Sequence, residues 1–320
     1  MRAIYYEEFG SADVLKFGTM PKPSLKAGQV LVQVAAAAVN PIDRRLRSGE
    51  LQDFFEREWP IIPGWDFSGR IVEVGSEVSG WTVDQDVVGL AFSWFLHGGT
   101  YAEYVAVDVA SIAAKPKNIS FIEGAALPLV CLTAWQALVE FSDLKAGQKV
   151  LIQAGAGGLG SVAIAIAKHI GAYVYTTARE HNFDYVKSRG ADVVIDYTTS
   201  DYAEVIRERE PDGLDVVLES VTHEAAITAA IHLVKAGGAV PYMNNEPPEM
   251  AEIKQKNIKT EFLHHRPDGQ MLGQIMALYA EEKLSIPHIE VMKLEEAAEA
   301  HRRSESWQTR GKMVLHIQDM

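Results

Sequence analysis

The stretch KVLIQAGAGGLG, residues Lys149 to Gly160, is a short apolar run that ends in three glycines spaced G-x-G-x-x-G. Glycines allow a tight turn and a close approach to a pyrophosphate, and the amides opening the next helix point at its anionic oxygens. SVAIAIAKHIGA (161–172) reads as that helix and YVYTTA (173–178) as a second strand. Strand, turn, helix and strand fit within about 30 residues, as a βαβ unit requires. The stretch therefore predicts a dinucleotide site rather than a structural glycine turn.

The predicted cofactor contacts lie in this turn and at the ends of later strands, because ligands of parallel sheets bind at the carboxyl ends of the strands. From the turn they are Gly155, Ala156, Gly157, Gly158, Leu159 and Gly160. Val221 and Met243, which follow the later strands, are predicted to lie near the nicotinamide.

The end of the second strand distinguishes between two cofactors. An NAD enzyme usually places an acidic residue there, on the ribose hydroxyls. Here Thr177 and Ala178 are followed by Arg179, and a guanidinium suits a 2′-phosphate that a carboxylate would repel. Lys187 is a second possible phosphate partner. The pattern predicts NADPH, with two alternatives left open. Glu180 becomes a ribose acid if the strand ends two residues later, and, independently of that, Arg179 is a solvated loop residue.

Composition limits the class of protein. The chain has 320 residues, 48% of them hydrophobic, which suggests two domains. Its one cysteine, Cys131, rules out an internal disulfide, and no stretch reads as a signal peptide or membrane span, so we expect a cytoplasmic protein. The net charge of −13 argues against nucleic acid or an anionic membrane as a partner.

The pattern of predicted secondary structure changes near residue 120. Before it, short β-type runs separated by glycine and proline predict a compact, largely antiparallel, barrel-like domain. After it, five strands alternate with four helices, which predicts a parallel sheet covered by helices, an α/β architecture. The five predicted strands are Val150–Ala154, Tyr173–Ala178, Val193–Asp196, Asp215–Glu219 and Ala239–Met243. Beyond Pro267 we expect a helix, a short strand, a second helix and a closing strand.

Several strings in this order resemble the zinc-independent branch of the medium-chain dehydrogenases/reductases, which contains quinone oxidoreductases, zeta-crystallin and enone reductases. They are VNPIDRRLRSG (39–49), PIIPGWDFSGRIVEVG (60–75), GGTYAEYV (98–105), AGAGGLGSVAIAIAKHIGA (154–172) and LEEAAEAHRRSESWQTRGKMVL (294–315). The resemblance covers essentially the whole chain. It implies a GroES-like β-rich catalytic domain, residues 1–120 and 267–320, and a doubly wound Rossmann NADP-binding domain, residues 121–266.

The resemblance also implies a site without metal. Zinc alcohol dehydrogenases of the superfamily have cysteine and histidine ligands at the positions matching Asn40, Trp65 and Leu129, and none of these three residues is a zinc ligand. Without a Lewis acid, the better substrates spread the developing charge themselves. The expected reaction is NADPH-dependent hydride transfer to a quinone or to the activated C=C bond of an enone or alkenal. A zinc-less alcohol or aldehyde reductase and a non-catalytic NADPH-binding protein are the alternatives.

Four residues are predicted to carry the chemistry, each with a structural alternative. Asn40, in the family's N-P-x-D/E motif, faces substrate or nicotinamide, or else holds the turn before Pro41. Asp43 anchors the loop or polarises a water, or else caps a helix. Trp65 forms an aromatic wall for a flat acceptor, or else packs in the core. Thr133 matches a nicotinamide contact, or else packs a helix.

Further expectations concern the edges of the site and the assembly. Tyr197 matches an NADPH contact of the family, or else packs at a strand end. Trp94 and Phe95 are expected to line the opening beside Trp65, whereas His97 is expected to be an exposed loop residue. Arg44 and Arg45 stand where some relatives have a tyrosine, so no general acid is assigned. The run KTEFL (259–263) is expected to be a sheet-edge strand that pairs with its copy in a homodimer.

Overall fold

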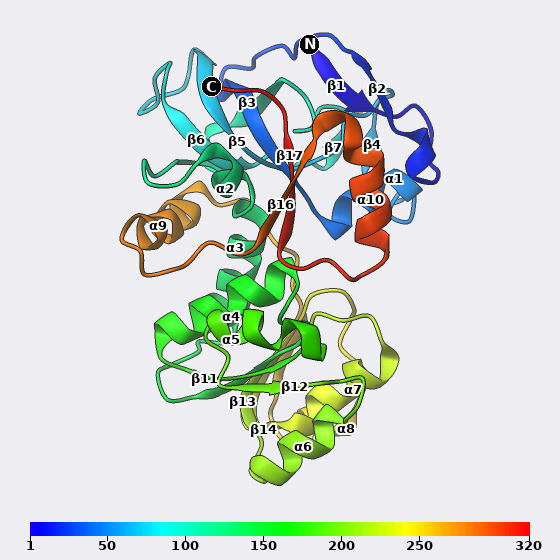
Figure 1. The fold of residues 1–320 in the computed structure, drawn as a ribbon, viewed down its shortest axis with the longest axis vertical. Helices are drawn as coiled ribbons and strands as arrows, with labels where there is room; N and C mark the ends of the chain where they lie inside the picture. Colours follow the sequence, from blue (N-terminus) through cyan, green and yellow to red (C-terminus); the bar gives the residue numbers. More distant parts are fainter. The chain divides into compact units, whose positions relative to one another are not determined.

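The computed structural model describes all 320 residues, which divide into two compact units (Figure 1). The first comprises residues 1–132 and 266–320, and the second comprises residues 133–265. Residues 121–132 thus group with the first unit, not with the second as the boundary at 120 implied. The reason is local packing, since Ala125 and Ala126 at the end of α2 (Phe121–Ala125) lie against Ala36 and Ala38 of β3 (Gln29–Val39).

The first unit is built on one seven-stranded sheet, in which all neighbouring pairs but one are antiparallel. Its path is β16-β17-β3-β5-β6-β9, and β8 also pairs with β3. The eleven residues of β3 are largely buried because they pair with three strands, and their valines and alanines pack well there. The other elements are β1 (Arg2–Tyr5), β2 (Lys16–Thr19), α1 (Pro41–Ser48), β4 (Glu56–Arg57), β5 (Asp66–Val74), β6 (Asp86–Leu90), β7 (Phe95–Leu96), β8 (Tyr104–Asp108), β9 (Ile112–Ala114), α9 (Gly269–Ala280), β16 (Ile289–Lys293), α10 (Ala297–Glu305) and β17 (Lys312–His316). Helix α3 (Pro128–Trp135) begins in the first unit and ends in the second.

The second unit is a six-stranded parallel sheet with the order β12-β11-β10-β13-β14-β15. Figure 1 shows α4 and α5 on one side of this sheet and α6, α7 and α8 on the other. The strand order reverses between β10 and β13, which is where doubly wound sheets bind their ligands. The elements are β10 (Lys149–Ile152), α4 (Gly158–Ile170), β11 (Tyr173–Thr177), α5 (Phe183–Ser188), β12 (Val193–Ile195), α6 (Tyr202–Arg209), β13 (Leu214–Leu218), α7 (Glu224–Leu233), β14 (Val234–Tyr242), α8 (Ala251–Gln255) and β15 (Lys259–Phe262), preceded by a π-helix (Gln136–Phe141).

The five predicted strands of this α/β unit are confirmed within two residues, except that β14 begins at Val234 rather than Ala239, and four helices, α4 to α7, stand between them as expected. No helix in the structure combines the length and the apolar composition that crossing a membrane requires.

Candidate cofactor and substrate site

In the turn after β10, the space around Gly155, Gly157 and Gly160 differs from one glycine to the next. A Cβ on Gly155 would lie 2.0 Å from Thr176 Oγ1, and one on Gly160 would lie 2.3 Å from the Ala154 carbonyl oxygen. Both positions are closed by packing between turn, strand and helix. A Cβ on Gly157 would meet one atom within 4 Å, the Ala154 oxygen at 3.4 Å, so the turn is open there. Gly157 also caps the thirteen-residue helix α4. An open backbone at a helix N-terminus fits a pyrophosphate.

The adenosine end of the predicted site lies just beyond β11. That strand ends at Thr177, and Glu180 begins a 3-10 turn (Glu180–Asn182). The prediction that the strand ends before Arg179 is therefore confirmed. Arg179 Nε donates a hydrogen bond of 3.1 Å to the Tyr197 hydroxyl, which brings two predicted cofactor residues together. The Tyr197 side chain is 48% exposed. Lys187 lies on α5 with its ammonium 5.8 Å from the Phe183 ring centre.

The carboxyl edge of β13 and β14 holds a buried acid that the sequence analysis missed. Glu219 is fully buried, its Oε1 accepts a hydrogen bond of 3.0 Å from the Val221 amide, and its Oε2 has no partner. Burial raises the pKa of Glu219 to about 7. The Met243 amide donates to the Glu219 carbonyl oxygen at 3.0 Å. Val221 and Met243 are therefore neighbours through Glu219, at the edge where a nicotinamide is expected.

In the first unit, one buried carboxylate joins four segments of the chain. Asp66, at the start of β5, accepts hydrogen bonds from the Asn40 side-chain amide at 2.9 Å and from the Leu129 backbone amide at 2.7 Å. The Lys312 ammonium lies 3.3 Å from the same carboxylate. Asp66 is fully buried and Lys312 is 3% exposed. Burial raises the pKa of Asp66, and the charge of Lys312 opposes that rise.

Lys312 also fixes the orientation of the Asn40 amide. Its ammonium donates a hydrogen bond to Asn40 Oδ1. An ammonium can only donate, so the oxygen of the amide must face Lys312 and the nitrogen must face Asp66. One of the two N–H groups on Nδ2 then donates to Asp66, and the second makes no hydrogen bond in the structure.

Asp43 lies in the first turn of helix α1, three residues after Asn40. Its Oδ2 accepts hydrogen bonds from the Asn40 backbone amide at 2.8 Å and from the Tyr101 hydroxyl at 2.9 Å, while Oδ1 has no partner. Asp43 is not the N-cap, because α1 begins at Pro41 and the N-cap is Asn40, but it is the third residue of the helix and its side chain closes a capping box with Asn40. Burial raises the pKa of Asp43 to about 7, and the two donors oppose that rise.

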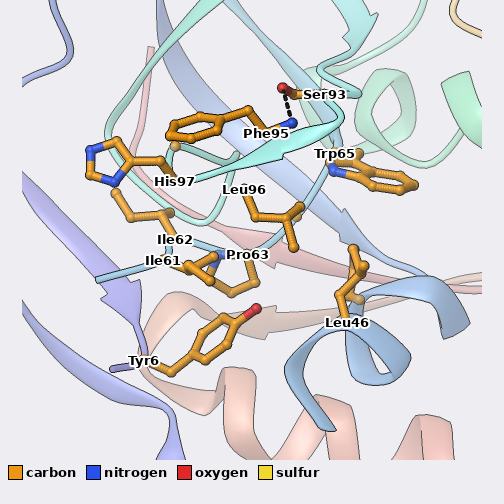
Figure 2. A pocket seen from close by; sticks show the side chains of 13 residues that line it. Tyr6, Leu46, Ile61, Ile62, Pro63, Trp65, Ser93, Phe95, Leu96 and His97 are labelled. Carbon is orange, nitrogen blue, oxygen red and sulfur yellow. Dashed lines mark hydrogen bonds between the residues drawn. The ribbon is translucent and has the colours of Figure 1, made fainter. Parts of the chain in front are cut away.

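Trp65 is 4% exposed and lines a small cavity with the loop that carries Ser93 and Phe95, as Figure 2 shows. The Tyr6 hydroxyl points toward Pro63 and Leu96 in this view. His97 is exposed, as expected, and its ring Nδ1 lies 3.1 Å from the Glu58 carbonyl oxygen.

Thr133 lies in α3, is 9% exposed, and has no hydrogen-bond partner at Oγ1. Nearby Cys131 is fully buried, which suits a small residue of the core.

Two family models match the chain. Residues 26–117 match the "Alcohol dehydrogenase GroES-like domain" and residues 189–315 match "Zinc-binding dehydrogenase". A 2-methylene-furan-3-one reductase of Solanum lycopersicum is 34% identical over 99% of this chain and 79% of its own length. The chain belongs to the zinc-independent medium-chain dehydrogenases/reductases, in the quinone oxidoreductase and enone reductase branch.

Other relatives agree with this family assignment. The NADPH-dependent alkenal/one oxidoreductase of Arabidopsis thaliana, described as chloroplastic, is 37% identical over 75% of this chain and 61% of its own length. The chain thus spans less than two thirds of that relative. The quinone oxidoreductase of Coxiella burnetii has a solved structure with 34% identity, 99% coverage of both chains and a TM-score of 0.88. The two units are accordingly the GroES-like and Rossmann parts of the family fold.

Within this family, the turn and helix α4 are where a nicotinamide dinucleotide binds, and the open Gly157 and the unpartnered Glu219 oxygen fit such a group. Asn40, Trp65 and Leu129 occupy the three positions at which the zinc branch has its ligands. The Asn40 side chain and the Leu129 backbone amide both donate hydrogen bonds to Asp66, and Trp65 precedes Asp66 in the sequence. No three His, Cys, Asp or Glu side chains in the structure are grouped so that they could share a metal ion.

Proposed function

We propose that this chain is an NADPH-dependent oxidoreductase that transfers hydride, without zinc, to a quinone or to the activated C=C bond of an enone or alkenal. The observation that supports this most is the amide of Asn40, held between Lys312 and Asp66 with one N–H left over. A single oriented donor suits an enolate or hydroquinone anion, whose charge is already spread over several atoms. The names of the plant relatives point to the same acceptors.

The roles of the residues follow from this geometry. The nicotinamide, when bound, supplies the hydride. The open turn at Gly157 holds the pyrophosphate, and Glu219, Val221 and Met243 support the nicotinamide end. Thr133, whose hydroxyl is free of partners, donates to the cofactor or the substrate. Asp43 fixes the backbone of Asn40, and Trp65 supports the apolar wall.

The preference for NADPH rests on Arg179 and Tyr197. Their hydrogen bond places a guanidinium and a hydroxyl together where the ribose 2′-position is expected, and both groups can donate to a phosphate. We expect a lower KM for NADPH than for NADH. Replacing Arg179 by Ala raises the KM for NADPH about tenfold or more and changes that for NADH little. The control Arg207→Ala, at an exposed position of α6, changes neither KM. Equal KM values in the wild type contradict the preference.

The test of the whole function is NADPH oxidation with a panel of quinones, enones and alkenals, together with measurement of bound metal. Turnover of at least one conjugated acceptor by metal-free protein is expected. Asn40→Ala lowers kcat/KM by about 10²-fold, the cost of losing one oriented donor. Stoichiometric zinc, or an unchanged rate in Asn40→Ala, contradicts the assignment. If no compound of the panel causes NADPH oxidation, a non-catalytic NADPH-binding protein is favoured.

Two expectations about the cell and the assembly belong to this proposal. We infer a homodimer, because β15 (Lys259–Phe262) is the last strand of its sheet and its free edge can pair with a second copy. Sedimentation of the purified protein checks the dimer. Residence in the cytoplasm is likewise a proposal, which imaging of a tagged chain in its host checks.

A further inference from the structure

A group of four aromatic rings runs from the buried centre of the first unit to its surface. Trp65 and Phe92 have ring centres 4.8 Å apart, and Phe92 and Trp94 have centres 5.0 Å apart, both edge to face. Phe55 and Trp94 are stacked, with centres 5.2 Å apart and planes inclined by 28°. We call Phe55, Trp65, Phe92 and Trp94 the aromatic stack. Trp65 is 4% exposed, whereas Trp94 is 60% exposed.

The inner end of the aromatic stack lies at the candidate site. Trp65 and Asp43 line the same small cavity, and the Asp43 carboxylate accepts a hydrogen bond from the backbone amide of Asn40. The buried end of the stack is thus linked through Asp43 to the residue proposed to stabilise the reduced acceptor.

The cavity beside Trp65 does not take an aromatic ring. It is lined by Tyr6, Leu46, Trp65 and Phe95 among others, and it has room for about one water molecule (Figure 2). A ring-sized ligand must therefore lie on the outer part of the stack, where the indole of Trp94 is exposed.

The Trp94 indole is held ready for such a ligand. Phe55 packs against it in a nearly parallel arrangement, and the Phe95 amide donates a hydrogen bond of 3.0 Å to the Ser93 hydroxyl, which orders the loop (Figure 2). Because the ring is already fixed by Phe55 and Phe92, stacking on it costs little further side-chain entropy. Phe54 is 71% exposed and Phe95 is 44% exposed, so the sequence neighbours of Phe55 and Trp94 present further aromatic surface to solvent.

We propose that the exposed indole of Trp94 is a stacking platform that selects acceptors bearing a flat aromatic ring, such as aryl enones and fused-ring quinones, over small alkenals. This inference rests on the proposed function, because it assigns the acceptor of the same site. An aromatic pair contributes about 0.5–1.5 kcal/mol beyond burial, which corresponds to a preference of about 2- to 10-fold.

The test uses two enones that differ in a single group. 4-Phenyl-3-buten-2-one carries a phenyl ring where 3-penten-2-one carries a methyl group, and the reacting C=C and C=O bonds are the same. The measured quantity is the ratio of kcat/KM for the phenyl compound to kcat/KM for the methyl compound. Trp94→Ala lowers this ratio by about 2- to 10-fold, and Trp94→Phe, which keeps a ring, retains most of it.

A matched control is Trp307→Ala. Trp307 is also an exposed tryptophan of the first unit, at 55%, but it packs on Arg44 and not on the aromatic stack. The control keeps the wild-type ratio. A ratio that Trp94→Ala leaves within twofold of the wild type overturns the proposal. So does a changed oligomeric state in Trp94→Ala with an equal loss on both enones, since Trp94 is then an interface residue.

Failure of the proposed function is recognised separately. If neither enone is reduced, the function is wrong, and the platform is tested by equilibrium dialysis of the phenyl enone alone. Weaker binding by Trp94→Ala than by Trp307→Ala supports the platform in that case, and equal binding overturns it.

Discussion

The buried pair of Lys312 and Asp66 offers a test of how the candidate site is held together. In Lys312→Met the apolar stem is kept and the ammonium is lost. Asp66, fully buried, then keeps two hydrogen-bond donors, Asn40 and the Leu129 amide, but loses its only cationic contact in the structure. Removing one partner of a buried ion pair costs about 3–5 kcal/mol, because the other charge stays buried. The two remaining donors favour the lower end, about 3 kcal/mol.

The assay is urea unfolding followed by tryptophan fluorescence. Five of the six tryptophans lie in the first unit, so the signal reports mainly on the unit that contains the pair. With a slope of about 2–3 kcal/mol per M, a loss of 3 kcal/mol lowers the urea midpoint by about 1 M or more. The double variant Lys312→Met, Asp66→Asn removes both charges and recovers much of the loss, because replacing both members of a buried pair is often nearly neutral.

A surface pair serves as the control. Lys16 and Glu7 are 2.6 Å apart, but both side chains are 54% exposed, and such pairs contribute at most about 1 kcal/mol. Lys16→Met therefore leaves the midpoint almost unchanged. The reasoning is refuted if Lys312→Met loses no more than Lys16→Met, or if the double variant is no more stable than Lys312→Met alone.

Two further predictions concern the glycine turn and Asp43. Gly157→Ala keeps the wild-type melting temperature but raises the KM for NADPH by about tenfold or more. Gly160→Ala raises that KM and also lowers the melting temperature, because its Cβ would lie 2.3 Å from a backbone oxygen. Equal melting temperatures of the two variants contradict this prediction. The pKa of Asp43 is raised to about 7, so the native state keeps a proton that the unfolded state releases from about pH 4 upward. Stability therefore falls as the pH rises from about 4 to 7, by up to about 4 kcal/mol, and Asp43→Asn lacks this part of the loss. Parallel urea midpoints of the two proteins across that range contradict the assignment.

The second unit could be predicted closely from the sequence because its signals are local. The strands are short apolar runs, and the first helix between them, α4, ends at a glycine, Gly171. The start of β14 was missed because KAGG, residues 235–238, reads as a turn, whereas the structure includes it in the strand, with Gly237 at a φ of +75°.

The candidate site of the first unit could be predicted only in part, because its contacts are not local. Asn40 belongs to a motif, but Lys312 lies 272 residues away from it in the sequence. No periodicity reports such a contact. One signal was present: Asp66 and Lys312 each stand at the first position of a strand, directly before an apolar residue, and a charge in that position, when buried, needs a partner.

The same contacts explain why a site without a metal can be rigid. A metal would fix its ligands by coordination. Here Asp66 joins β5 to Asn40, the residue after β3, and to Leu129 of α3. Lys312 joins β17 to Asn40 and to Asp66. Asn40 is thus held at its backbone by Asp43 and at its side chain by Asp66 and Lys312. Because Asn40, Asp66 and Lys312 are at most 3% exposed, water does not compete for these bonds. A neutral amide held this firmly is a preorganised donor, and this is the role that we propose for Asn40 toward a delocalised anion.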